Sequence, residues 1–184
     1  MAPPSYVDLG KSSKDLFNKG YNFGFLKLDS TTKAGEKREI EFKTGASHNV
    51  ASQKLFGSLD IKYKLPVYGI TLTEKWNTDN QLGTVVEIED QVAKGFKLTL
   101  DSTYAPHLGK RSGKLKGEWS NDRLRVNTDV ALDAGPIVNL SAVAAHEGWL
   151  LGLQGGFDTA KSKVNATNIA FGRSTGEYAV HTFM

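Results

Sequence analysis

Two patterns of apolar and polar residues divide the chain. Over the first twenty residues, apolar or small residues recur with helical spacing, while aspartates and lysines occupy the other side. Pro3, Pro4 and Ser5 suit the start of a helix, and Gly20 suits its end. The pattern predicts one short amphipathic helix over about residues 5–19. Its apolar face contains Tyr6, Leu9, Ser13, Leu16, Phe17 and Gly20.

After Phe25 the spacing of apolar residues changes from helical to alternating, and it stays alternating from there on. Alternation over short segments, separated by clusters of Gly, Pro, Asn and Asp, is typical of antiparallel strands joined by turns. About twelve such segments follow one another, and no second helical pattern of any length occurs. The sequence therefore predicts an all-β, up-and-down arrangement of strands after one N-terminal helix.

Alternation alone does not distinguish a soluble barrel from a membrane barrel, because it shows only that the two faces differ. Three features favour the membrane barrel. The strands recur regularly with short turns, and their apolar faces contain many Gly, Ala and Thr residues. About twelve strands would also enclose an interior too wide for side chains to fill, whereas small filled barrels have about eight. We expect a transmembrane antiparallel β-barrel with a water-filled lumen, and a soluble ligand-binding barrel is the alternative.

Composition excludes several other classes of protein. The 184 residues suit one domain, and a net charge of +3 is too small and too evenly spread to indicate nucleic-acid binding. The absence of cysteine excludes disulfides and thiolate chemistry. The four histidines have no metal-ligand spacing, and no Gly-x-Ser-x-Gly motif occurs. No apolar stretch is long enough for a membrane helix, and no secretory signal is visible. We therefore expect neither an enzyme, nor a cofactor, nor a metal site.

Three stretches of sequence resemble the mitochondrial voltage-dependent anion channel family. The first begins with Tyr-Val-Asp-Leu-Gly-Lys at 6–11 and continues to Gly24. The second is Thr-Leu-Thr-Glu-Lys-Trp-Asn-Thr-Asp-Asn at 71–80, and the third begins with Glu-Gly-Trp-Leu at 147–150 and runs to 162. The resemblance covers essentially the whole chain in order and without large gaps.

The resemblance implies a channel of the mitochondrial outer membrane that passes ATP, ADP and small anions and closes partly with voltage. The family barrel has nineteen strands, and its N-terminal helix lies in the lumen. On this basis, residues 1–24 form the amphipathic helix and a glycine hinge, and residues 25–184 form an incomplete set of barrel strands. The resemblance also implies a lipid bilayer, nucleotides in transit, further copies of the channel, and hexokinase-type or apoptosis-regulator proteins as partners.

The sequence printed here stops at Met184, whereas the family continues for about another third of its length, with about seven more strands. Unpaired strand edges are costly in lipid. Two readings follow. The chain could be a fragment or alternative product that does not conduct and acts as an interaction module, or its strands could close on themselves into a narrower pore.

The resemblance assigns nucleotide contacts to five residues. Lys11 and Lys19 lie on the polar side of the predicted helix, where a solvated surface is the alternative interpretation. Gly95, Phe96 and Lys97 match a Gly-Leu-Lys triplet of the family, with Phe in the middle position. Plain strand alternation, with Phe96 toward lipid and Lys97 toward the lumen, explains this triplet better.

Alternation predicts that four basic residues line the pore, namely Lys114, Lys116, Arg123 and Arg125. A positive field in a water-filled pore concentrates anions. The predicted selectivity therefore follows from which face of the strands these residues occupy.

By resemblance, four residues take part in gating: Leu9, Gly20, Gly24 and Glu74. Leu9 is expected to pack the helix against the wall, while the two glycines are hinge positions. Glu74 is in register with Tyr68, Ile70 and Leu72, so it is expected to face lipid. The alternative is that alternation slips at the strand end, near the membrane interface. Trp76, Trp119 and Trp149 fall near strand ends, as interface anchors do.

Overall fold

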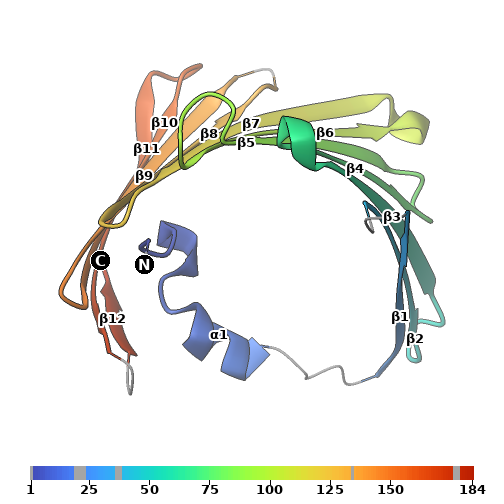
Figure 1. The fold of residues 1–184 in the computed structure, drawn as a ribbon. Coiled ribbons are helices and arrows are strands. Elements are labelled where there is room, and N and C mark those ends of the chain that lie inside the picture. Colours follow the sequence, from blue (N-terminus) through green and yellow to red (C-terminus); the bar gives the residue numbers. More distant parts are fainter. Residues whose placement is uncertain (1, 19–23, 36–38, 134, 176–178) are drawn as a thin grey trace. The chain divides into compact units, whose positions relative to one another are not determined.

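The computed structural model describes residues 2–18, 24–35, 39–133, 135–175 and 179–184 (Figure 1). They fall into two compact units. Unit 1 contains the N-terminal segment, residues 92–98 and the chain from residue 114 onward, and unit 2 contains residues 20–91 and 99–113. Each unit is described by itself below.

The N-terminal segment of unit 1 contains two short helices in place of the single helix expected over 5–19. A 3₁₀ turn, η1, covers Tyr6–Asp8, and the helix α1 covers Lys11–Asn18. Leu9 between them is extended, and Gly10 has a φ of +69°, which an L side chain rarely adopts. The prediction of an unbroken helix is therefore wrong at these two residues.

The predicted apolar face of the helix is also only partly buried. Tyr6 and Leu9, before the break, are buried, whereas Leu16 and Phe17 on α1 are more than two-thirds exposed. Helical spacing treats all four residues as one face. The break at Leu9 and Gly10 instead lets only the first part of the segment pack against strands.

Unit 2 contains antiparallel strands in sequence order. Each strand pairs with the next one along the chain, from β1 to β5. A 3₁₀ turn, η2 (Pro66–Tyr68), leads into β4, so Tyr68 precedes the strand in which alternation had placed it. The strands are β1 (Phe25–Ala34), β2 (Ile40–Asn49), β3 (Leu55–Leu65), β4 (Ile70–Asn77) and β5 (Leu82–Glu89).

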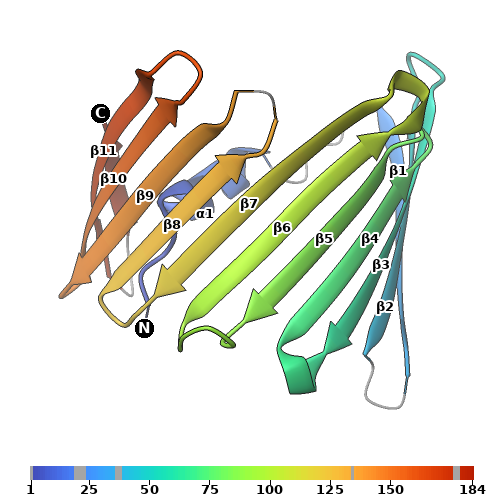
Figure 2. The same cartoon turned by 90° about the horizontal axis from the view of Figure 1, so that it is seen from above.

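Unit 1 has the same kind of strand order. Neighbouring strands again pair antiparallel, from the second part of β7 to β12, and Figure 2 shows β8 to β11 side by side. Strands β6 (Phe96–Ala105) and β7 (Lys110–Ser120), joined through the turn η3 (Pro106–Leu108), each have residues in both units. The others are β8 (Leu124–Ala131), β9 (Ile137–His146), β10 (Trp149–Asp158), β11 (Lys163–Ser174) and β12 (Ala179–Phe183).

The strand registers separate two faces in each unit. In unit 1 we call the face toward the N-terminal segment the inner face and the opposite one the outer face. One inner row is Arg125, Val143, Gly152 and Ala170, and the neighbouring outer row is Leu124, Ala144, Leu151 and Phe171. In unit 2 the lysine face contains the row Lys43, Asp60 and Lys75, and the apolar face contains the row Phe42, Ile61, Glu74 and Thr84.

The expected fold is confirmed in its main features. The described residues form twelve strands and one α-helix near the N-terminus, and every pairing described within a unit is antiparallel between sequence neighbours. Among the described helices, none has the length and apolar character needed to cross a membrane.

Candidate functional site

The N-terminal segment docks on the inner face of unit 1 through two side chains. Leu9 and Tyr6 are 2% and 8% exposed and pack with three strand residues, Val143, Leu150 and Ala170. Each buried apolar side chain of this size contributes about 1.5–3 kcal/mol. The docking therefore depends mainly on these two residues, not on α1.

A glycine makes room for this contact. A Cβ atom on Gly152 would lie 2.9 Å from both Leu9 Cδ1 and Tyr6 Cδ2, closer than real Cβ contacts allow. Gly152 is on β10, next to Val143 and Ala170 in the same inner row. The lack of a side chain at this position is what lets the segment approach the sheet.

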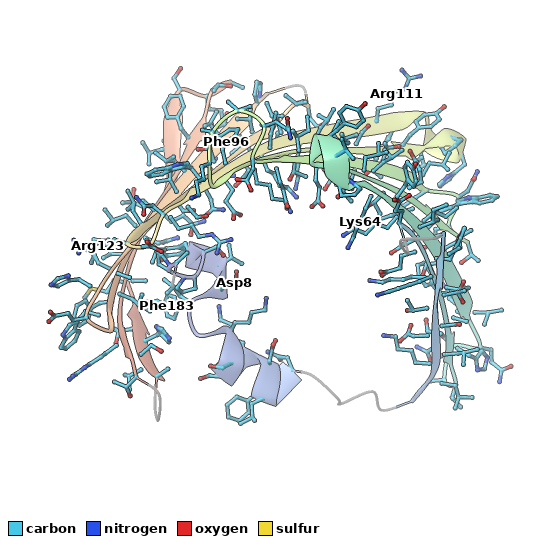
Figure 3. The ribbon with its side chains drawn as sticks, in the orientation of Figure 1. Asp8, Lys64, Phe96, Arg111, Arg123 and Phe183 are labelled. Carbon is cyan, nitrogen blue, oxygen red and sulfur yellow. The ribbon has the colours of Figure 1, made fainter. Side chains whose placement is uncertain are left out.

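Phe183 of β12 provides a second contact for the same segment. Its ring meets the Tyr6 ring edge-to-face, with 6.4 Å between the ring centroids. Lys14 Nζ lies 5.4 Å from the Phe183 ring, and a Cβ on Gly10 would be 3.7 Å from it. Figure 3 labels Asp8 on the segment and Phe183 on the strand. Aromatic and cation–π pairs of this kind each add about 0.5–1.5 kcal/mol.

Polar groups also organise the segment. Ser5 Oγ donates to Asp8 Oδ2 over 2.6 Å, and Lys11 Nζ donates to Asp8 Oδ1 over 2.8 Å. The hydrogen bond from Lys11, and then the one from Ser5, hold the pKa of Asp8 below its usual value of 3.8. The same contact with Asp8 raises the pKa of Lys11. On β8, Arg125 Nη1 donates to the carbonyl of Pro3 over 3.4 Å.

These contacts predict a pH dependence for the docked segment. Because the pKa of Asp8 is lowered in the folded state, its stabilising contribution is complete above its unfolded value and is lost as pH falls through the folded one. Protection of the backbone amides of residues 2–18 should therefore decline below about pH 4. Hydrogen exchange with mass spectrometry, corrected for intrinsic exchange rates, measures this protection as a function of pH. Asp8→Asn should lack this change, and equal losses in both proteins would contradict the assignment.

An open hollow of about 480 Å³ lies between the N-terminal segment and strands β9 to β12. Lys11 and Asp8 line it from the segment, and Leu150 and His181 line it from the sheet. Among the described residues of the proposed nucleotide set, Lys11 alone lines this hollow. Lys19 and Gly20, assigned to nucleotide contact and gating, lie outside the described residues.

A second hollow, of about 230 Å³, lies on the lysine face of unit 2. Glu41 accepts from Lys43 Nζ over 3.0 Å and lies 3.7 Å from Lys33 Nζ. Lys62 and Lys75 line the hollow and belong to no ion pair found among the described residues. The hollow is lined by Glu41, Lys43, Asp60, Lys62, Thr73, Lys75, Val85 and Glu87.

The eukaryotic porin family matches residues 2–184 of this sequence. The chain belongs to that family. It is 59% identical over 184 residues to a probable voltage-dependent anion-selective channel of Caenorhabditis elegans, covering all of this chain and 65% of that protein. It is 52% identical over 181 residues to the non-selective voltage-gated ion channel VDAC2 of Xenopus laevis, covering 98% and 64% of the two chains.

A third relative is human VDAC2, also described as a non-selective voltage-gated ion channel, with 50% identity over 181 residues and coverage of 98% and 61%. This porin thus spans about three-fifths of the length of the curated relatives it matches.

The structure places three of the four predicted pore-lining residues on the inner face of unit 1 by register. Lys114 and Lys116 are on β7, and Lys116 is directly opposite Asp129. Arg125 forms an ion pair with Glu118. The carboxylates of Glu118 and Asp129 on the same face offset part of this positive charge. Arg123 precedes β8 and is exposed, and its carbonyl accepts from the backbone N–H of Ala145.

The sequence analysis missed the lysine face of this porin. Its lysines are on β1 to β4, alternate with apolar residues, and so carry the same signal that identified Lys114 and Lys116. In Figure 3, Lys64 of this face and Arg111 point to opposite sides of the unit 2 sheet. The lysines of this face are Lys27, Lys33, Lys43, Lys62, Lys64 and Lys75.

The Gly95–Lys97 triplet has a structural role at a turn. Gly95 has a φ of +77°, and its carbonyl accepts from the backbone N–H of Ser120 over 2.9 Å. A Cβ on Gly95 would collide with the Ser120 carbonyl oxygen. Glycine is therefore required here by the backbone, whether or not a nucleotide passes.

Two further residues of the gating set are described. Gly24 has a φ of +76°, and its carbonyl accepts from the backbone N–H of Val50 over 2.9 Å. Glu74 lies on the apolar face of unit 2 and is opposite Ile61 and Thr84. Thr84 Oγ1 donates to Glu74 Oε2 over 2.9 Å. Among the described residues that β2 to β5 place on this face, Glu74 is the only carboxylate.

Proposed function

We propose that this porin forms a voltage-dependent, anion-favouring pore of the mitochondrial outer membrane through which ATP, ADP and small anions diffuse. The separation of faces supports this most directly. Apolar residues on the outer face, such as Leu151, Leu153 and Phe157, are 43–50% exposed in the bare chain. Most charged strand residues, Glu74 and Arg173 excepted, occupy the opposite faces. Such a sheet suits lipid on one side and water on the other.

This distribution argues against a soluble ligand-binding barrel. In a soluble barrel the alternating apolar residues would meet in a dry interior. The buried apolar residues described here, apart from Ala105, instead gather where the N-terminal segment meets the sheet, and Phe157 lies outside this cluster with 43% of its surface exposed. A lipid surrounding would cover the outer face without requiring another layer of protein.

The charge pattern supports a preference for anions. The strand registers place six lysines and the carboxylates of Asp29, Glu41, Asp60 and Glu87 on the lysine face of unit 2, and Lys62 and Lys75 line its hollow beside the last three of these. In unit 1, Glu118 forms an ion pair with Arg125 and Asp129 lies opposite Lys116 in register, and both carboxylates reduce the local positive charge. The selectivity of the pore is therefore expected to depend mainly on the lysine face.

Conductance in planar bilayers tests the proposal. The chain as printed and a chimera continued with the remaining residues of the Caenorhabditis elegans relative are reconstituted separately under a salt gradient. Steps of conductance that decrease with voltage, together with an anion-favouring reversal potential, support it. If the chimera conducts and the 184-residue chain does not, the interaction-module alternative would be favoured for the 184-residue chain. A silent chimera would overturn the proposal.

Glu74 is proposed to contribute to gating and self-association, because a carboxylate on a lipid-facing surface is costly and rarely without function. Replacing Glu74 with glutamine keeps the size of the side chain and removes its charge. Voltage-dependent closure and chemical cross-linking between copies should both decrease severalfold. Thr84→Val, which removes the hydroxyl that donates to Glu74, should have a smaller effect in the same direction. Unchanged closure and cross-linking in Glu74→Gln would exclude this role.

A further inference from the structure

Three side chains form a cluster on the outer face of unit 1, at one end of the β10–β11 pair. The rings of Trp149 and Phe171 are stacked, with 5.2 Å between centroids and 30° between planes. The guanidinium carbon of Arg173 lies 4.9 Å from the Trp149 ring. Trp149 is 43% exposed and Phe171 is 52% exposed. An arginine and two aromatic rings are thus presented together on the face that the proposed function assigns to lipid.

The strand registers show where the cluster lies along the strands. Trp149, the first residue of β10, is directly opposite Arg173, one residue before the end of β11. His146, the last residue of β9, is opposite Trp149 on its other side. Toward the strand middle, the next outer row contains Leu151 and Phe171. The cluster therefore joins a polar end of the strands to a continuous apolar surface.

Arg173 differs from Arg125 of the inner face in whether a carboxylate pairs with it. Arg125 is held by Glu118, whereas the described residues contain no carboxylate within ion-pair distance of Arg173. Glu147, in the turn before β10, is exposed and forms no ion pair with it among these residues. A guanidinium that lies over an indole ring keeps its N–H groups in its own plane, where they remain available to an acceptor.

A phospholipid matches both parts of this surface. Its phosphate accepts two parallel N–H bonds from a guanidinium, its glycerol region lies at the depth where tryptophan is enriched, and its acyl chains cover the apolar row beyond. A lipid with net negative charge gains attraction to the cation in addition, by about 1 kcal/mol for each basic residue near the surface.

We propose that Arg173, Trp149 and Phe171 form a binding site for the phosphate of an anionic phospholipid. The proposal rests on the proposed function only in placing the outer face of unit 1 against lipid. It adds a specific ligand to this end of the strands, and it assigns the recognition to Arg173, with Trp149 positioning the guanidinium.

Fluorescence quenching tests the site. In a Trp76→Phe, Trp119→Phe background, Trp149 is the one remaining tryptophan, so its emission reports on the lipid beside it. The chain is reconstituted in phosphatidylcholine vesicles that contain a small fraction of either brominated phosphatidylglycerol or brominated phosphatidylcholine. We expect the phosphatidylglycerol to occupy the site about fivefold more readily, which corresponds to about 1 kcal/mol.

Matched variants separate the site from general surface charge. Arg173→Gln should reduce the preference to about one, and Arg173→Lys, which keeps the charge but not the planar fork, should give an intermediate value. Lys161→Gln removes one positive charge at the β10–β11 turn, the other end of the same pair, and should leave the preference unchanged. A preference that survives Arg173→Gln, or that falls equally in Lys161→Gln, would overturn the proposal. If neither brominated lipid quenches Trp149, the outer face of unit 1 does not contact the membrane. That result would reject the placement of this face against lipid, on which the proposal rests.

Discussion

Replacing Gly152 with valine is expected to release the start of the N-terminal segment from unit 1. The branched side chain would occupy the space filled by Leu9 and Tyr6, since even a Cβ would approach their atoms to 2.9 Å. Loss of about 2 kcal/mol of packing raises the undocked population about thirtyfold. Tryptic cleavage at Lys11 and Lys14 should accelerate by the same factor, because slow proteolysis follows the population of the open form.

Gly155 provides the matched control. It is on the same strand as Gly152 but on the outer face, and a Cβ there would have no atom within 4 Å. Gly155→Val should leave the cleavage rate within about twofold of the starting protein. If both valine variants accelerated cleavage equally, the cause would be a general disturbance of strand β10, and the loss of the docking contact would not explain the result. In bilayers, the same comparison tests whether docking sets the voltage response.

Reversing the charge of Lys62 and Lys75 together is expected to change the ion preference of the proposed pore from anions to cations. Both side chains line the hollow on the lysine face and are outside the ion pairs described there, and the carboxylates of Glu41, Asp60 and Glu87 line the same hollow. Substitution of both lysines by glutamate therefore leaves acidic residues in excess around the hollow. The sign of the reversal potential under a tenfold potassium chloride gradient measures the effect. Its size should decrease as the salt concentration rises, because mobile ions screen the field.

Lys54→Glu is the control for this double variant. Lys54 lies in the β2–β3 turn, where its carbonyl accepts from Asn49, and is exposed away from the hollow. A change of the reversal potential in Lys54→Glu as large, per charge, as in the double variant would mean that total charge sets the selectivity and that the lysine face has no special part in it.

Alternation predicted the strands and their faces because it is a local property of a pleated chain. Each register pairs residues of the same face, so Lys114, Lys116 and Arg125 came together on the inner face without any need to know their neighbours. The same rule identifies Lys62 and Lys75 once it is applied to the first strands as well. It does not show which of these charges have acidic neighbours, because Glu118 reaches Arg125, and Asp129 comes opposite Lys116, only after the strands pair.

The break in the N-terminal helix was not predictable from spacing. Helical periodicity is satisfied through Leu9 and Gly10, and nothing local opposes an unbroken helix strongly. The extended conformation of Leu9 is explained by a distant feature, the room left by Gly152 beside Val143. The contact of Tyr6 with Phe183 has the same origin. Tertiary packing decided the local conformation here, as it commonly does for short segments.

The contact between Tyr6 and Phe183 also implies an order in which parts of unit 1 fold. Tyr6 leaves the ribosome long before β9 to β12 exist, so the segment has no surface to pack against until those strands have paired. Contacts so distant along a chain form late, since closing a long loop costs entropy before any interaction rewards it. The N-terminal segment is therefore expected to stay solvated while the strands insert and to be the last part of unit 1 to become ordered.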